Sequence, residues 1–126
     1  MSSVITALSE ALRTLSLAGD YLPANRISLV IDKIAECYAT EFNLAESRAF
    51  MDSFELLKGA MTSRPMSDED ELVVRIFVYN LSSMEEHYGT DREAMEERLM
   101  RIVEEVLGGE FANLVNLFVI SIKRIK

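Results

Sequence analysis

Cysteine, histidine, proline and tryptophan are scarce in this sequence of 126 residues, which has one cysteine, one histidine, two prolines and no tryptophan. A single cysteine excludes a disulfide framework and any zinc site built from several thiolates, so we expect a reducing, cytoplasmic setting. No stretch reaches the roughly 18 apolar residues that a membrane-spanning helix needs. The N-terminus also lacks the basic segment and apolar block of a secretory leader. The sequence therefore predicts neither a membrane span nor secretion.

The sequence signatures of common enzyme classes are also missing. No Gly-x-Gly-x-x-Gly, Gly-Lys-Ser/Thr or Gly-x-Ser-x-Gly motif occurs, which removes the usual dinucleotide, phosphate-loop and serine-hydrolase arrangements. Cys37 lies within an apolar stretch, and His87 follows Glu85 and Glu86 at spacings that point their side chains in different directions on a helix. Neither Cys37 nor His87 has a sequence neighbour that would activate it for catalysis. We expect no enzyme activity, no cofactor and no metal site.

Positive charge is limited, since 13 basic residues stand against 21 acidic ones and the net charge is −8. The imbalance is concentrated in residues 66–110, which contain thirteen acidic and four basic residues, whereas residues 111–126 contain three basic and no acidic residues. Lysine and arginine supply most nucleic-acid affinity because they displace counterions from the phosphates. The acidic middle of the chain therefore argues against direct binding to nucleic acid.

Apolar residues make up 49% of the chain and recur at spacings of three and four along nearly its whole length. This periodicity predicts an all-α fold, a compact single-domain bundle of five to six short helices over residues 1–126. The first helix is expected to stop at Gly19, the second to span residues 23–41, and the last to occupy residues 110–126. Gly108 and Gly109 are expected to end the helix before it.

Three polar residues are predicted to cap helices at their N-termini. Asn43 and Thr90 each stand three residues before a glutamate, which is the spacing of a capping box, and are expected to begin the third and fifth helices. Ser67 is expected to cap the fourth helix. The four acidic residues that follow Ser67 suit the positive end of a helix dipole better than a calcium loop.

Two segments are more apolar than an ordinary surface helix requires. Residues 72–79 (LVVRIFVY) resemble a strand in composition, but we predict a helix because no second segment alternates as a partner strand would. Residues 111–122 are apolar on almost every side and are too few to span a membrane. The helix that contains them is expected to be central in the bundle or to face another subunit.

Protein interaction is the function that remains. We predict a non-enzymatic module, a small acidic adaptor, chaperone or regulator, that binds another protein through apolar helix faces and an acidic surface. A homodimer is one form that this interaction could take. The seven methionines are expected to fill the core or to line a groove for a partner helix.

The alternative hypothesis is an acidic inhibitor, of the kind that phages and mobile elements encode, which blocks a basic nucleic-acid-binding channel of a target protein. Such a decoy needs one continuous acidic face, and Arg92, Arg98 and Arg101 interrupt the acidic residues of the fifth predicted helix. The residues predicted to bind a partner, acidic and apolar, are Glu86, Glu93, Glu96, Glu97, Glu104, Leu114, Leu117, Phe118 and Ile122.

Overall fold

The computed structural model describes residues 3–125 and folds them into six α-helices, with no strand in that range. The helices are α1 (Ser3–Leu17), α2 (Ala24–Phe42), α3 (Arg48–Thr62), α4 (Asp68–His87), α5 (Arg92–Leu107) and α6 (Ala112–Ile125). The predicted all-α bundle is confirmed, and so is the helical state of residues 72–79, which lie inside α4.

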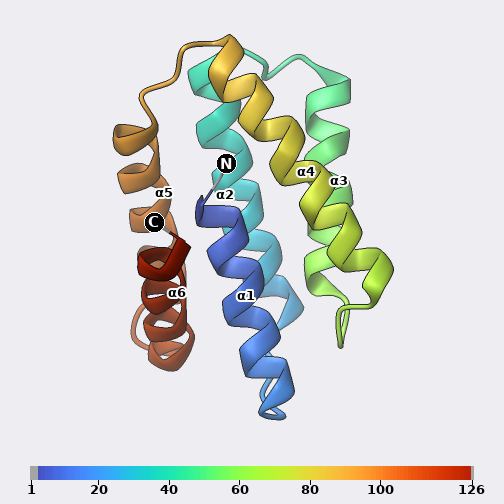
Figure 1. The fold of residues 1–126 in the computed structure, drawn as a ribbon, viewed down its shortest axis with the longest axis vertical. Coiled ribbons are helices and arrows are strands. Elements are labelled where there is room, and N and C mark those ends of the chain that lie inside the picture. The colour runs from blue at the N-terminus through green and yellow to red at the C-terminus, as the bar shows by residue number, and fades with distance from the viewer. Residues whose placement is uncertain (1–2, 126) are drawn as a thin grey trace.

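The six helices form two layers (Figure 1). Helices α6, α1 and α4 lie side by side in the layer nearer the viewer, and α5, α2 and α3 form the layer behind. The apolar core between the layers includes side chains that are completely covered, among them Ile31, Tyr38, Leu57 and Phe118. Each helix turns its apolar stripe toward this core, as the spacing of three and four requires.

Helix α6 lies at the edge of the front layer, not at the centre of the bundle. It packs against α1 and α5, where it buries Leu114, Phe118 and Ile122, while Ile120 on its outer side is 53% exposed. Helix α1 takes the central place, because it contacts α4, α5 and α6. The prediction that the last helix is the central one is therefore wrong, although three of its apolar residues do belong to the core.

The boundary between α2 and α3 differs from the predicted one. Asn43 does not begin α3; it ends α2 in the left-handed conformation, with φ of 55°. Asparagine adopts this conformation more readily than most residues because its short side chain hydrogen-bonds locally. Ser47 is the N-cap of α3, and its Oγ accepts a hydrogen bond of 3.2 Å from the backbone N–H of Phe50.

The predicted cap of α4 is confirmed. The backbone N–H of Asp70 donates to Ser67 Oγ at 3.1 Å, and the Ser67 N–H donates to the Asp70 carboxylate at 2.9 Å, which completes a capping box. These bonds favour the ionised carboxylate. The backbone donor of Ser67, followed by the hydroxyls of Ser63 and Ser67, lowers the pKa of Asp70.

The N-cap of α5 is Asp91, one residue after the predicted Thr90. The Asp91 carboxylate accepts from the Ala94 N–H at 3.2 Å, whereas the buried Thr90 hydroxyl has no hydrogen-bond partner in the described part of the chain. We expect Asp91→Ala to lower the free energy of unfolding by about 1 kcal/mol, and the isosteric Thr90→Val to change it by less than about 0.5 kcal/mol. Urea denaturation of both variants measures this. Equal losses in the two variants would contradict the assignment of the cap.

Candidate functional site

Helix α4 carries three large apolar side chains on its outer surface, more than any other helix in residues 3–125. Leu72 and Ile76 are 53% and 52% exposed, and Tyr79 is 74% exposed. Their spacing of four and three places them in one stripe. Val74 and Phe77 face the core, so α4 is apolar on two sides, which accounts for the nearly continuous apolar run of residues 72–79.

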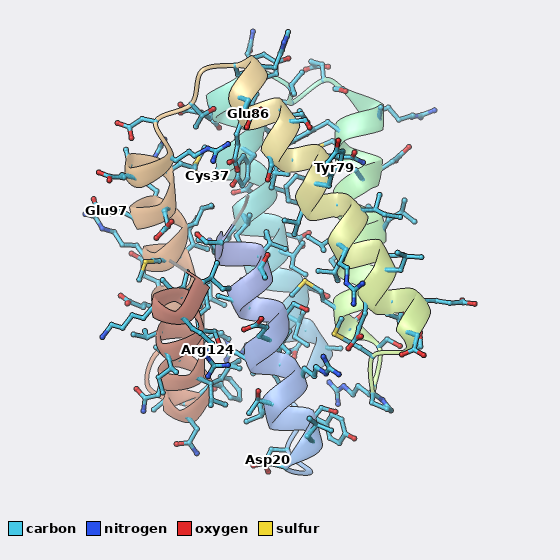
Figure 2. All side chains as sticks on the ribbon, viewed as in Figure 1. Asp20, Cys37, Tyr79, Glu86, Glu97 and Arg124 are labelled. Carbon is cyan, nitrogen blue, oxygen red and sulfur yellow. The ribbon has the colours of Figure 1, made fainter. Side chains whose placement is uncertain are left out.

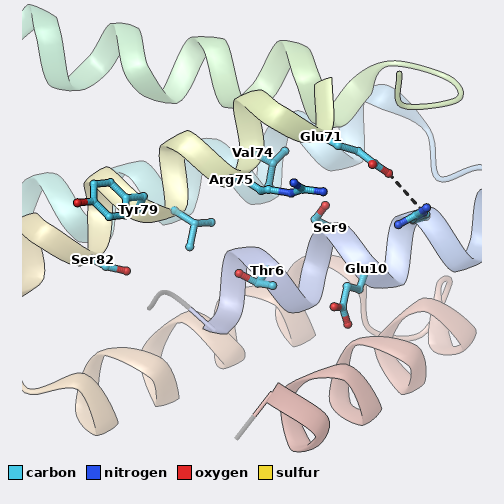
Figure 3. A pocket seen from close by; sticks show the side chains of 10 residues that line it. Thr6, Ser9, Glu10, Glu71, Val74, Arg75, Tyr79 and Ser82 are labelled. Atoms are coloured by element: carbon cyan, nitrogen blue, oxygen red, sulfur yellow. Dashed lines mark ion pairs between the residues drawn. The ribbon is translucent and has the colours of Figure 1, made fainter. Parts of the chain in front are cut away.

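A groove of about 600 Å³ separates α4 from α1. Val74 and Val78 of α4 form part of its apolar lining, and the hydroxyl residues Thr6 and Ser9 of α1 and Ser82 of α4 lie along it (Figure 3). These side chains are too short to fill the space between the two helices. On its other side, α1 packs closely on α6.

The charged groups of the α1–α4 groove are unevenly paired. An ion pair between Arg13 Nε and Glu71 Oε1, 3.3 Å apart, closes one end. Arg75 lies along the groove (Figure 3) and forms no ion pair within residues 3–125. The side chain of Glu10 points away from α4. The lining residues Glu10, Arg13, Glu71 and Arg75 together carry no net charge, but Arg75 stays without an ion pair in the described chain, so its positive charge is available between α1 and α4.

A second groove, of about 250 Å³, lies on the other side of α4, against α3. No charged residue lines it. Leu56 of α3 and Ile76 of α4 stand at its exposed border, and Met84 lines it, so one of the methionines predicted for the core or a groove lies in a groove. Phe54 and Phe77 close its floor, with ring centroids 4.8 Å apart in an edge-to-face arrangement. The exposed stripe of α4 is thus a ridge between two grooves.

Two of the acidic residues predicted to bind a partner are engaged within the chain. The Glu86 carboxylate lies 3.2 Å from Arg92 Nη2, across the turn between α4 and α5. The Glu96 carboxylate accepts a hydrogen bond of 2.8 Å from the hydroxyl of Ser3. Both contacts connect neighbouring helices, so these carboxylates contribute to packing as well as to surface charge.

The other three predicted acidic residues, Glu93, Glu97 and Glu104, are exposed on α5. Figure 2 shows Glu97 on α5, on the other side of α1 from Tyr79. Arg98 on the same helix pairs with Glu41 of α2 at 3.1 Å. The structure therefore keeps the acidic surface of α5 apart from the α4 ridge and its grooves, and arginines remain interspersed in it.

The apolar residues predicted to bind a partner do not form an open surface. Leu114, Phe118 and Ile122 are buried against the rest of the chain, and Leu117 is half-buried at the margin of the same core. Leu114, Phe118 and Ile122 therefore have no free surface to offer a partner, because α1 and α5 pack against α6. Other helices of the same chain shield these apolar side chains from water. The assignment of Leu117 to a partner surface stays a prediction.

A buried polar cluster connects α2, α4 and α5. The hydroxyl of Tyr38 donates a hydrogen bond of 2.7 Å to Glu85 Oε1, and Glu85 is only 5% exposed. Arg92 Nε lies 3.9 Å from the other oxygen of that carboxylate. The hydrogen bond from Tyr38 and the ion pair with Arg92 both stabilise the buried carboxylate, so this cluster links three helices.

Cys37 lies partly buried on α2, and His87 lies on the surface at the end of α4. The Cys37 thiol donates to Met95 Sδ at 3.6 Å, and burial raises the pKa of this thiol, which favours the unreactive protonated form. His87 is exposed at the end of α4, where its ring meets the edge of Tyr88. Residues 3–125 contain no group of three or more histidine, cysteine or acidic side chains that could hold a metal ion. In the same range, every helix is too short or too polar to cross a membrane.

Comparison of the chain with models of protein families, with curated proteins and with solved structures found no match. Its function is therefore inferred from the surfaces described above.

The α4 ridge is not among the residues predicted from sequence to bind a partner. The signal for it is nevertheless present in residues 72–79, where the apolar side chains exceed what one buried helix face can hold. The groove toward α1 has no such signal, because residues 6–13 and 71–82 meet only in the folded chain.

Proposed function

We propose that this chain is a non-enzymatic protein-interaction module whose partner binds the outer ridge of α4 and the grooves on either side of it. The observation that carries the proposal is the exposed stripe of Leu72, Ile76 and Tyr79. Full burial of a leucine or isoleucine side chain is worth about 1.5–3 kcal/mol, and the fold forgoes about half of this at Leu72 and Ile76, which are 53% and 52% exposed. A contiguous apolar patch beside grooves is typical of surfaces that bind other proteins.

The acidic surface of α5 plays a secondary part in this proposal. Its exposed residues Glu93, Glu97 and Glu104 lie away from the ridge, so they act at longer range. A net charge of −8 keeps the chain soluble and attracts a partner with basic surface before contact, an effect that salt weakens.

Site-specific photocrosslinking tests which surface meets the partner. Benzoylphenylalanine would replace Tyr79 on α4, Ile120 on α6 or Glu97 on α5, one position at a time, in cells of the organism that encodes the chain. We expect a covalent adduct with another protein from position 79 and none from position 120, which serves as an exposed apolar control. An adduct from position 97 alone would favour the acidic inhibitor instead.

Two matched substitutions sharpen the test. Ile76 and Ile120 are 52% and 53% exposed, so glutamate at either position changes charge and polarity equally. We expect Ile76→Glu to abolish the adduct from position 79 and Ile120→Glu to leave it intact. Both variants should keep the free energy of unfolding within about 0.5 kcal/mol of the parent, because both sites are on the surface. Equal losses of the adduct would contradict a specific role for α4.

A further inference from the structure

We infer that the α1–α4 groove receives an amphipathic helix of a partner protein, about three turns long, with a carboxylate positioned against Arg75. This inference rests on the proposed function, because it specifies what the partner places beside the α4 ridge. It goes further by stating the length, secondary structure and charge of the docked segment.

The length follows from the residues at the two ends of the groove. Glu71 and Arg13 form the ion pair at one end, and Thr6 and Ser82 lie toward the other, so α1 and α4 run in opposite directions along it. Residues 71 to 82 of α4 rise by about 16 Å, which is the length of about eleven helical residues. A partner helix of three turns would therefore contact the groove from end to end.

The side chains that line the groove suit a docked helix. The facing positions carry short side chains, Thr6 and Ser9 on one wall and Val78 and Ser82 on the other, which let another backbone approach closely. Tyr79 lines the groove and is also part of the exposed stripe, so the apolar surface of the groove is continuous with the α4 ridge. Apolar residues of a docked helix at spacings of three and four would cover the groove floor and this ridge together.

The charge of the partner helix follows from Arg75. Arg13 is held by Glu71, whereas Arg75 has no ion pair in the described chain and lies along the same groove. A guanidinium binds a carboxylate through two parallel hydrogen bonds, a geometry that selects an acidic residue at one place on the incoming helix. The partner segment is therefore acidic opposite Arg75, the reverse of what the chain's net charge of −8 alone would suggest.

A displayed library of helical peptides provides the test. The probes are alanine-rich peptides of about fourteen residues, with leucines on one stripe and randomised positions on either side of it, selected for binding to the full chain. We expect the selected peptides to share aspartate or glutamate at one position. Arg75→Glu should weaken them by about tenfold or more. Arg101→Glu, the same change at an exposed arginine of α5, should alter binding by less than about twofold.

A charge exchange completes the experiment. A selected peptide whose shared acid is replaced by lysine should recover binding to the Arg75→Glu chain, and it should lose binding to the parent. Failure to select any peptide, selected peptides without a shared acid, or equal effects at Arg75 and Arg101 would each overturn the inference. So would a dimer of the unliganded chain in sedimentation that Arg75→Glu dissociates, because a second copy would then fill the groove. Crosslinking from position 79 decides the proposed function separately, since it does not depend on Arg75.

Discussion

Phe118→Ala is expected to lower the free energy of unfolding by about 3–5 kcal/mol. Phe118 is completely buried on the face of α6 that packs against α1, and its ring belongs to the continuous core of the bundle. Its removal loses the transfer free energy of the ring and leaves a cavity that the surrounding helices can only partly close. A domain of this size has about 5–15 kcal/mol of stability, so the variant should unfold at a much lower urea concentration.

A matched substitution on the same helix distinguishes core packing from a general effect on α6. Ile120 is 53% exposed on the outer side, and Ile120→Ala should change the free energy of unfolding by less than about 0.5 kcal/mol. Circular dichroism during urea denaturation measures both variants. A loss below about 1 kcal/mol for Phe118→Ala would mean that α6 is not docked on α1 in solution.

The sequence predicts the helices well where a local pattern of residues is compatible with only one backbone structure. Gly19 and Gly109 have positive φ, of 85° and 83°, in the turns after α1 and α5, and a glycine is the residue that adopts this conformation without strain. Residues 72–79 were ambiguous in composition, yet the lack of any partner strand in the sequence was sufficient to predict a helix. Pairing between strands that are distant in the sequence is thus easier to exclude than to predict.

The caps were harder to predict because neighbouring polar residues compete for the same role. Asn43 and Ser47 both precede the apolar stripe of α3, and Thr90 and Asp91 both precede that of α5. Which of them becomes the cap depends on backbone dihedrals that the surrounding fold imposes. Asn43 is at a left-handed position, which places it at the end of α2 and leaves Ser47 to begin α3.

The candidate site was hidden from sequence reasoning for a related reason. Apolar residues on more than one side of a helix show that it needs extra cover, but they do not show whether the same chain provides it. In α6 the residues predicted for a partner, such as Phe118, are covered by α1, whereas in α4 Ile76 and Tyr79 stay exposed. The difference is that α1 and α5 pack over the apolar face of α6, whereas α4 packs on α1 and α3 with its inner side and keeps its outer side exposed.

Tyr38→Phe is expected to lower the free energy of unfolding by about 1.5–3 kcal/mol, the range for a hydrogen bond to a charged group. The substitution keeps the ring but removes the hydroxyl that donates to Glu85 Oε1 at 2.7 Å. The buried carboxylate would then retain Arg92, whose Nε lies 3.9 Å from its other oxygen. Because Glu85 is 5% exposed, its carboxylate is largely removed from bulk water when this donor is lost. Urea denaturation at neutral pH measures the loss.

Removing the carboxylate as well should cancel much of that loss. Glu85→Met fills a similar volume without a charge, and Arg92 keeps its ion pair with Glu86 at 3.2 Å. In the double variant Tyr38→Phe/Glu85→Met, no buried oxygen is left without its donor. The free energy of unfolding of the double variant should therefore fall by less than the sum of the decreases in the two single variants, the difference being about 1 kcal/mol or more. Effects that add to within about 0.3 kcal/mol would show that the two side chains do not interact in solution. The cycle therefore measures whether this hydrogen bond, and not the packing of the ring alone, holds α2 against α4.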